Sequence, residues 1–168
     1  SVKEEFLSEV VKEIKRQYGE RPLENKDYGK IINEKHFKRL CGLIDGSKVV
    51  FGGEANPGTN QIAPTVMDGV TAGDAVMGEE IFGPIMPVLS FDHFENLVKE
   101  LKKQPKPLAL YLFSSNKKHI QAVTTQLSYG GGCINVVVVH LATSGRGFGG
   151  VGESGMGSYH GKEGCVAF

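Results

Sequence analysis

The sequence lacks three features that would assign a protein to a class at once: a framework of cysteines, a long hydrophobic run and an excess of one charge. Its three cysteines, Cys41, Cys133 and Cys165, are widely spaced and form no CxxC pair. An odd, scattered set of this kind predicts free thiols in a reducing compartment. No apolar run reaches the roughly 18 residues that a membrane helix needs, and no signal peptide is recognisable at the start. We therefore expect a cytoplasmic protein with no membrane partner.

The charges are balanced, with 19 basic and 19 acidic residues and a formal net charge of zero. A neutral chain has no electrostatic footprint for nucleic acid or for an anionic membrane surface, so we predict neither partner. The five histidines are scattered and include no HxxxH pair, which predicts no metal site. The rest of the composition is ordinary for a globular protein, and 168 residues suffice to bury a core.

Hydrophobic periodicity predicts two helices in the first half of the chain. The first covers residues 1–18, and its apolar positions repeat every four residues along one face. The second covers residues 33–44, with Asn33 as its N-cap. Short strands are predicted at residues 48–51 and 62–66, separated by a loop rich in Gly, Asn and Pro. The residues expected to be buried in the first helix are Phe6, Val10 and Ile14.

The second half alternates more regularly between strands and helices. Strands are predicted at residues 85–91, 108–113 and 133–139, with helices at 92–104 and 116–127 between them. This order implies right-handed crossovers and a parallel sheet. We therefore predict an α/β fold in three layers with a mainly parallel sheet. No change of composition marks a linker, so we treat the chain as one domain, although its two halves could be weak subdomains.

Residues 79–84 read Glu-Glu-Ile-Phe-Gly-Pro, which predicts a turn just before a strand. A carboxylate at the mouth of a parallel sheet can accept two hydrogen bonds from a ribose diol, and a nearby aromatic ring can pack against a flat heterocycle. Adjacent glutamates are also common on solvated surfaces, and Phe-Gly-Pro is common in turns that bury the ring. The spacing alone does not choose between these two interpretations.

Glycine is concentrated near the end of the chain, where nine of the 23 glycines lie between positions 145 and 164. Residues 147–152 match the pattern GxGxxG. The dinucleotide-binding form of that motif opens a helix, whereas here the glycines continue to Gly157. A phosphate-binding P-loop is excluded because no Gly-Lys-Ser or Gly-Lys-Thr occurs. We predict a tight structural loop that needs positive φ angles and close backbone approach.

Cys133 and His140 raise the question of a nucleophile and its base. They are seven residues apart in a predicted strand, where an odd separation places side chains on opposite faces. The apolar neighbours of Cys133 would raise the pKa of its thiol. We therefore expect Cys133 to be a buried structural thiol, and we assign no catalytic role to any of the three cysteines.

Several segments together resemble one known family, the NAD(P)-dependent aldehyde dehydrogenases. Residues 79–84 are identical to a motif of that family, and residues 147–162 resemble its glycine-rich segment near the catalytic mouth. Residues 27–33 and 131–135 are also similar, and the ending Ser-Gly-Met-Gly-Ser-Tyr-His-Gly-Lys points to its class 3-like branch. One departure is Gly147, where that branch usually has proline. The resemblance implies the C-terminal part of an aldehyde dehydrogenase catalytic domain, spanning residues 1–168.

The resemblance also implies roles for individual residues in a complete enzyme that oxidises aldehydes with NAD or NADP. Glu80 would bind the nicotinamide ribose, and Phe82 would contact the nicotinamide side. The residues that would border the substrate are Asn135, His140, Leu141 and Thr143. The catalytic cysteine and the general-base glutamate are expected before Ser1.

Two hypotheses follow for this chain. The first is part of an enzyme that takes a small-molecule aldehyde and assembles as a homo-oligomer. The alternative is a non-catalytic α/β fragment that only self-associates. The four consecutive valines at residues 136–139 favour association in both cases, because uncharged segments with high strand propensity pair with other chains when an edge is open.

Overall fold

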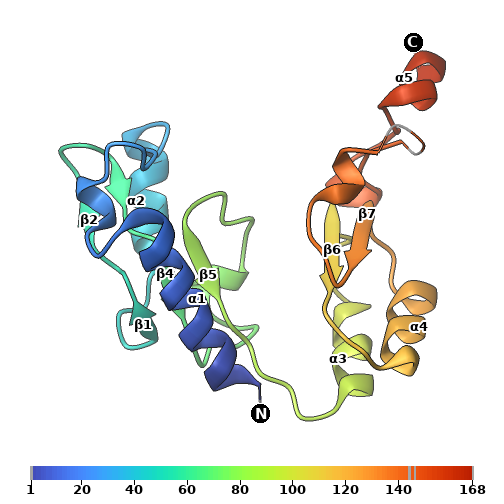
Figure 1. Ribbon diagram of the computed structural model, residues 1–168, viewed down its shortest axis with the longest axis horizontal. Helices are drawn as coiled ribbons and strands as arrows, with labels where there is room; N and C mark the ends of the chain where they lie inside the picture. Colours follow the sequence, from blue (N-terminus) through green and yellow to red (C-terminus); the bar gives the residue numbers. More distant parts are fainter. Residues whose placement is uncertain (1, 144, 146, 168) are drawn as a thin grey trace. The chain divides into compact units, whose positions relative to one another are not determined.

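The computed structural model describes residues 2–143, 145 and 147–167. The chain divides into two compact units, Ser1–Ser90 and Phe91–Phe168 (Figure 1). Helices and short strands occur in both, and each unit contains one parallel pair of strands. The predicted α/β class with parallel strands is therefore confirmed.

The first unit is built on a three-stranded sheet with the order β1-β4-β5. Strand β1 (Val49–Phe51) pairs antiparallel with β4 (Thr65–Met67), and β4 pairs parallel with β5 (Ile85–Pro87). A separate antiparallel pair joins β2 (Ala55–Asn56) to β3 (Gln61–Ile62).

The single strand predicted at residues 62–66 was wrong, because its two ends belong to different sheets. Residues 63 and 64 lie between β3 and β4 outside any strand, and Pro64 has no N–H to contribute to a ladder. The predicted strand at residues 85–91 is also shorter, ending at Pro87. Its partner strand β4 ends at Met67, so the backbone beyond Val88 has no ladder to continue.

Two helices accompany this sheet, α1 (Lys3–Tyr18) and α2 (Glu34–Leu43). The predicted N-cap of α2 is confirmed, since the Asn33 side chain accepts a hydrogen bond of 2.9 Å from the backbone N–H of His36. The predicted inner face of α1 needs correction. Phe6 is 45% exposed, whereas its neighbour Leu7 is the buried residue of the helix. The apolar stripe is wide enough to include both positions, and packing selects Leu7.

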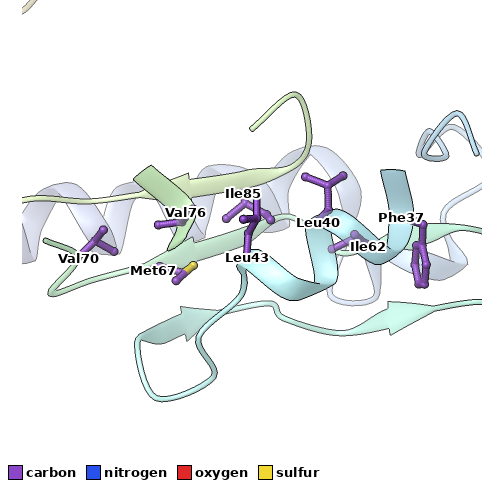
Figure 2. Close-up of a cluster of buried hydrophobic side chains, with 8 residues drawn as sticks. All are labelled: Phe37, Leu40, Leu43, Ile62, Met67, Val70, Val76 and Ile85. Carbon is purple, nitrogen blue, oxygen red and sulfur yellow. The ribbon is translucent and has the colours of Figure 1, made fainter. Parts of the chain in front are cut away.

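The core of the first unit lies where α2 meets the strands (Figure 2). Leu40 is at its centre, with no exposed surface. Ile81, which belongs to the turn at residues 79–84, packs against the same cluster. The buried side chains of the cluster are Phe37, Leu40, Leu43, Ile62, Met67, Val70, Val76 and Ile85. The core therefore reaches from α2 to the turn that the sequence singled out.

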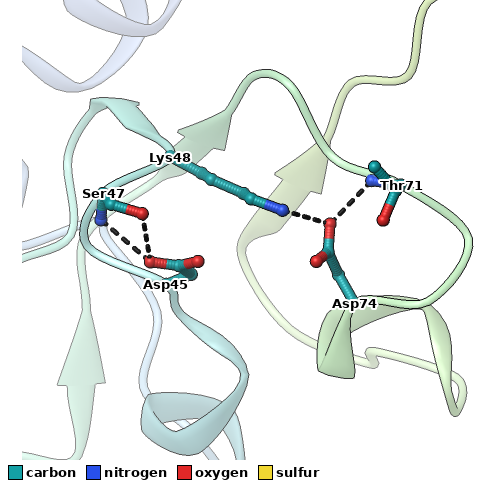
Figure 3. Close-up of polar contacts among 5 residues, drawn as sticks. All are labelled: Asp45, Ser47, Lys48, Thr71 and Asp74. Carbon is teal, nitrogen blue, oxygen red and sulfur yellow. Dashed lines mark hydrogen bonds and ion pairs between the residues drawn. The ribbon is translucent and has the colours of Figure 1, made fainter.

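A second set of contacts fixes the loop that leads into this turn (Figure 3). The Asp74 carboxylate accepts hydrogen bonds from the Lys48 ammonium and from the backbone N–H of Thr71. These bonds, with Lys48 contributing most, lower the pKa of Asp74. Nearby, the Asp45 carboxylate accepts bonds of 2.9 and 2.7 Å from the N–H and hydroxyl of Ser47. Lys48 thus ties the start of β1 to the segment just before residues 79–84.

The second unit contains α3 (Phe94–Leu101), β6 (Ala109–Leu112), α4 (Lys117–Gln126), β7 (Gly131–Ile134) and α5 (Gly161–Ala167). Strands β6 and β7 are parallel, and α4 forms the crossover between them, as predicted.

Helices α3 and α4 lie beside each other in this unit (Figure 1). The Phe94 ring of α3 stacks on the His119 ring of α4, with ring centroids 3.9 Å apart. At the other end of the pair, the Lys102 ammonium donates a 3.0 Å hydrogen bond to the side-chain oxygen of Gln126.

The strand predicted at residues 133–139 ends early, at Ile134. Asn135 and Val138 adopt positive φ angles of 58° and 68°, which an extended strand excludes. Val139–Leu141 then forms a short 3-10 helix, and the four valines from 136 to 139 are 41–54% exposed. Strand propensity was therefore overridden here by a turn centred on Asn135.

We predict that Leu40→Ala destabilises the first unit by about 2–5 kcal/mol, because it leaves a cavity at the centre of the core. The matched control is Leu89→Ala, since Leu89 is exposed and its truncation should change stability by less than about 0.5 kcal/mol. Denaturant unfolding of both variants followed by circular dichroism measures the difference. Equal losses in the two variants would show that α2 is not the centre of the core.

Candidate cofactor and substrate sites

The turn at residues 79–84 presents an unusual aromatic residue. Phe82 has a positive φ of 48° and its side chain is 84% exposed. A bulky residue in this backbone region costs on the order of 1–3 kcal/mol, and such conformations concentrate at functional sites. The interpretation of this motif as a turn with a buried ring is excluded, because Ile81 packs inward and Phe82 faces solvent.

Arg39 of α2 holds this turn through its guanidinium group. One terminal nitrogen, Nη2, donates a 2.6 Å hydrogen bond to the carbonyl of Ile81. The other, Nη1, donates to the carbonyl of Glu80 at 3.4 Å and lies 3.2 Å from Oε1 of Glu79. The Arg39 side chain is only 23% exposed, so these contacts are partly shielded from water. The sequence reasoning missed Arg39, because no local pattern connects it with a turn 40 residues later.

Close packing fixes the other end of the turn. A Cβ atom at Gly83 would lie 2.6 Å from the methyl groups of Leu40, so a side chain there would displace the core. The next residue, Pro84, accepts a 2.8 Å hydrogen bond from the backbone N–H of Thr65 in β4. The turn is therefore held at both ends, and its exposed part lies between them.

The two glutamates of the turn differ in their contacts. The Glu79 carboxylate is paired with Arg39, whereas the Glu80 side chain is exposed. Within residues 2–143, 145 and 147–167, the Glu80 carboxylate makes no hydrogen bond or ion pair. A fixed backbone that carries an uncommitted carboxylate and an exposed ring can bind a diol beside a flat ring system.

In the second unit, Asn135 closes the corner at which β7 ends. Its side-chain oxygen accepts a 2.8 Å hydrogen bond from the Ser114 N–H, and its side-chain nitrogen donates a 3.0 Å bond to the Ser114 carbonyl. Its own N–H donates to the Leu112 carbonyl at 2.8 Å. The amide of Asn135 thus joins the loop after β6 to the end of β7.

His140 lies against aromatic rings and a thiol. Its ring centroid is 5.6 Å from that of Tyr111 and 5.9 Å from that of Phe148. The Sγ atom of Cys133 is 3.5 Å from its Nδ1. The prediction that Cys133 and His140 point to opposite faces was wrong. The alternation rule holds only within a strand, and the chain turns back at Asn135 before it reaches His140.

The two remaining predicted substrate residues follow His140 directly. Leu141 is half-buried at the end of the short 3-10 helix. Thr143 is exposed, and its hydroxyl accepts a 3.3 Å hydrogen bond from the N–H of Gly145. The structure therefore brings His140 together with Cys133, whereas Thr143 lies in the loop beyond them.

The glycine-rich segment forms the tight structural loop that the sequence predicts. Phe148 and Tyr159 form an antiparallel bridge, with N–H to carbonyl distances of 2.6 and 2.9 Å. A Cβ atom at Gly149 would lie 2.1 Å from the carbonyl oxygen of Gly157, so only glycine allows the two backbones to approach so closely. The Phe148 ring projects from this loop towards His140.

Among the residues that the structure describes, no helix has both the length and the apolar character that crossing a membrane would require. Over the same residues, no group of three or more His, Cys, Asp and Glu side chains is arranged to hold a metal ion.

Comparisons with known proteins agree with one another. The family described as "Aldehyde dehydrogenase family" matches residues 1–168. The 4,4'-diaponeurosporen-aldehyde dehydrogenase of Staphylococcus aureus is 43% identical over 96% of the chain and 36% of that protein. The dimeric NADP-preferring aldehyde dehydrogenase of Bos taurus is 41% identical over all of the chain and 70% of that protein. Apart from the bovine protein, the chain spans 36–37% of the length of the first relatives that it matches.

Two solved structures show the same likeness. A substrate-bound state of Staphylococcus aureus AldH superposes with a TM-score of 0.95 at 42% identity, over 99% of the chain and 37% of that structure. The succinate-semialdehyde dehydrogenase from Burkholderia pseudomallei has a TM-score of 0.85 at 28% identity, over 98% of the chain and 35% of that structure.

We predict that Arg39→Gln releases the turn at residues 79–84. Losing hydrogen bonds from a charged group costs about 1.5–3 kcal/mol, which corresponds to at least tenfold faster amide exchange where the opening is a fast pre-equilibrium. Hydrogen exchange with peptide-level mass spectrometry measures it. The control is Arg21→Gln, because Arg21 forms an exposed pair with Glu24 outside this turn. Unchanged exchange in Arg39→Gln would show that Arg39 does not hold the turn.

Proposed function

Because the chain belongs to the aldehyde dehydrogenase family, we propose that it is part of an NAD(P)-dependent enzyme that oxidises small-molecule aldehydes to carboxylic acids. The chain covers 36% of the Staphylococcus aureus relative, which supports the proposal that it is one portion of a catalytic domain. We assign it to the C-terminal portion because of the motifs at residues 79–84 and 147–162. The proposal also includes a cytoplasmic location and assembly as a homo-oligomer. The word "dimeric" in the names of several relatives supports the assembly.

The turn at residues 79–84 is the observation that carries the proposal. Its backbone is held by Arg39 and by the packing of Gly83 on Leu40. The exposed Phe82 ring and the uncommitted Glu80 carboxylate fit the nicotinamide end of NAD or NADP. When bound, the nicotinamide accepts a hydride from the substrate. Glu80 would accept hydrogen bonds from the adjoining ribose, and Phe82 would limit where the ring can lie.

The second unit supplies the proposed substrate side. Asn135, His140, Leu141 and Thr143 would border the aldehyde, with Asn135 fixing the corner from which the others extend. His140 is held between Tyr111 and Phe148, so this wall is apolar and aromatic. Such a lining suits medium-chain and aromatic aldehydes better than small polar ones. We place the nucleophilic cysteine and the general-base glutamate of the complete enzyme outside these 168 residues.

We predict that Glu80→Gln in the complete enzyme slows hydride transfer by about 10- to 100-fold, since a small misplacement of the reacting ring can cost that much. Binding of the whole cofactor should weaken less, because Glu80 would contact only the reactive end. Single-turnover stopped-flow measurements of NADH or NADPH formation separate the two effects. Glu54→Gln is the control, as Glu54 is an exposed glutamate outside the turn. An unchanged single-turnover rate would exclude the role proposed for Glu80.

We also predict that the 168-residue chain alone does not oxidise aldehydes. None of Cys41, Cys133 and Cys165 lies in the sequence context of the family nucleophile. Formation of NADH or NADPH with benzaldehyde or hexanal measures this, and the complete enzyme in the same assay is the positive control. Turnover by the chain that disappears when one of the three cysteines is replaced by alanine would contradict the proposed location of the nucleophile.

A further inference from the structure

Cys133 and His140 form a thiol–imidazole pair whose thiol has no role in the proposed oxidation of aldehydes. Their Sγ and Nδ1 atoms are 3.5 Å apart, within the range of a hydrogen bond to sulfur. We infer that Cys133 is a nucleophilic thiol that adds to α,β-unsaturated aldehydes, with His140 as its base. The two residues come from β7 and from the short 3-10 helix that packs on it.

The imidazole is held in place by its surroundings. Tyr111 meets the ring at an interplanar angle of 64°, and Phe148 lies 5.9 Å away, measured between ring centroids. A Cβ atom at Gly131 would lie 2.6 Å from Cδ2 of His140, so glycine at this position makes room for the ring against the strand. A base that is already oriented spends little conformational entropy when it receives a proton.

No other polar group competes with Cys133 for this histidine in the part of the chain that the structure describes. There, Nε2 of His140 is buried without a hydrogen-bond partner, and the contact with Cys133 is the polar contact of the ring. A structural histidine normally uses a ring nitrogen to anchor itself to the protein. His140 is anchored by aromatic packing instead, which leaves Nδ1 to interact with the thiol.

The other two cysteines provide a comparison within the same chain. Cys41 lies in α2, where burial raises the pKa of its thiol. Cys165 is exposed in α5 and, among the described residues, makes no hydrogen bond with a histidine such as Cys133 makes. Cys133 is half-buried, so it combines partial access with a neighbouring base, which is the environment of reactive thiols. The aromatic rings around His140 also suit the alkyl chain of an unsaturated aldehyde.

The addition balances without an oxidant or a reductant. The thiol proton passes to Nδ1 of His140 as Sγ bonds to the β-carbon of the aldehyde. The electron pair of the carbon–carbon double bond moves towards the carbonyl group, and the α-carbon then takes the proton from Nδ1. One S–H bond and one π bond are replaced by one S–C bond and one C–H bond. The choice of an unsaturated aldehyde rests on the proposed function, since such compounds belong to the same chemical class as the proposed substrates.

The test treats the full chain with (E)-2-hexenal and follows adducts at each cysteine by peptide mass spectrometry. We expect Cys133 to react faster than the more exposed Cys165. His140→Asn should slow the reaction of Cys133 with hexenal by at least about tenfold. General-base catalysis typically contributes about 100-fold or more, so a tenfold loss is a conservative threshold. The rate at Cys165 should stay unchanged and serves as the control within each sample. Hexanal, which lacks the double bond, should leave no stable adduct.

A second variant covers the case in which His140→Asn disturbs the loop. Gly131→Ala keeps the histidine but displaces its ring, so it should also slow Cys133 relative to Cys165. Two results would overturn the proposal. One is a slower reaction at Cys133 than at Cys165 in the unaltered chain, and the other is an unchanged Cys133 rate in either folded variant. The assay needs no cofactor and no turnover. A negative result in the adduct assay therefore leaves the proposed dehydrogenase function intact. Conversely, an unchanged rate of hydride transfer in Glu80→Gln would leave the proposed reactivity of Cys133 intact.

Discussion

The contact between α2 and the turn at residues 79–84 is the constraint on which the first unit depends. Leu40 fills the core and leaves room above it only for glycine at position 83, while the adjacent Arg39 binds the carbonyls of Glu80 and Ile81. Apolar packing and charge-assisted hydrogen bonds thus act on the same few residues. Together they stabilise a positive φ at Phe82 that the residue would not adopt by itself, which leaves its ring exposed to solvent.

The second unit depends in a similar way on the point at which β7 ends. Asn135 tolerates a positive φ, and its side chain bonds to both backbone groups of Ser114, so the chain turns out of the sheet after Ile134. The turn brings His140 back over β7, where Gly131 leaves space for its ring. The contact between Cys133 and His140 therefore follows from the turn. The nucleophilic addition proposed for Cys133 is separate from the cofactor binding proposed for the turn at residues 79–84.

The helices were the most predictable part of the fold. The N-cap Asn33 acts over three residues, and its side chain accepts a backbone hydrogen bond as the sequence predicts. The structure shows that Asn116 caps α4 in the same way. Strand lengths were less predictable, because a strand continues only where a partner is present. Residues 62–66 separate into two strands at Ala63 and Pro64, and the valines after Asn135 leave the sheet despite their high strand propensity. In each case a break in the backbone, at Pro64 or at Asn135, outweighed the strand propensity of the neighbouring side chains.

The sequence by itself determined the family, through its local motifs, and the α/β class, through the periodicity of its apolar residues. It also indicated a tight glycine loop, since close backbone approach requires glycine at positions such as Gly149. Only the tertiary structure decided that Arg39 holds the turn and that Cys133 meets His140. The physical reason is that Arg39 and Ile81 are 42 residues apart and are joined only by the packing of α2 on the turn. Cys133 and His140 are close in sequence, but they meet only because β7 ends at Ile134 and the chain turns back at Asn135.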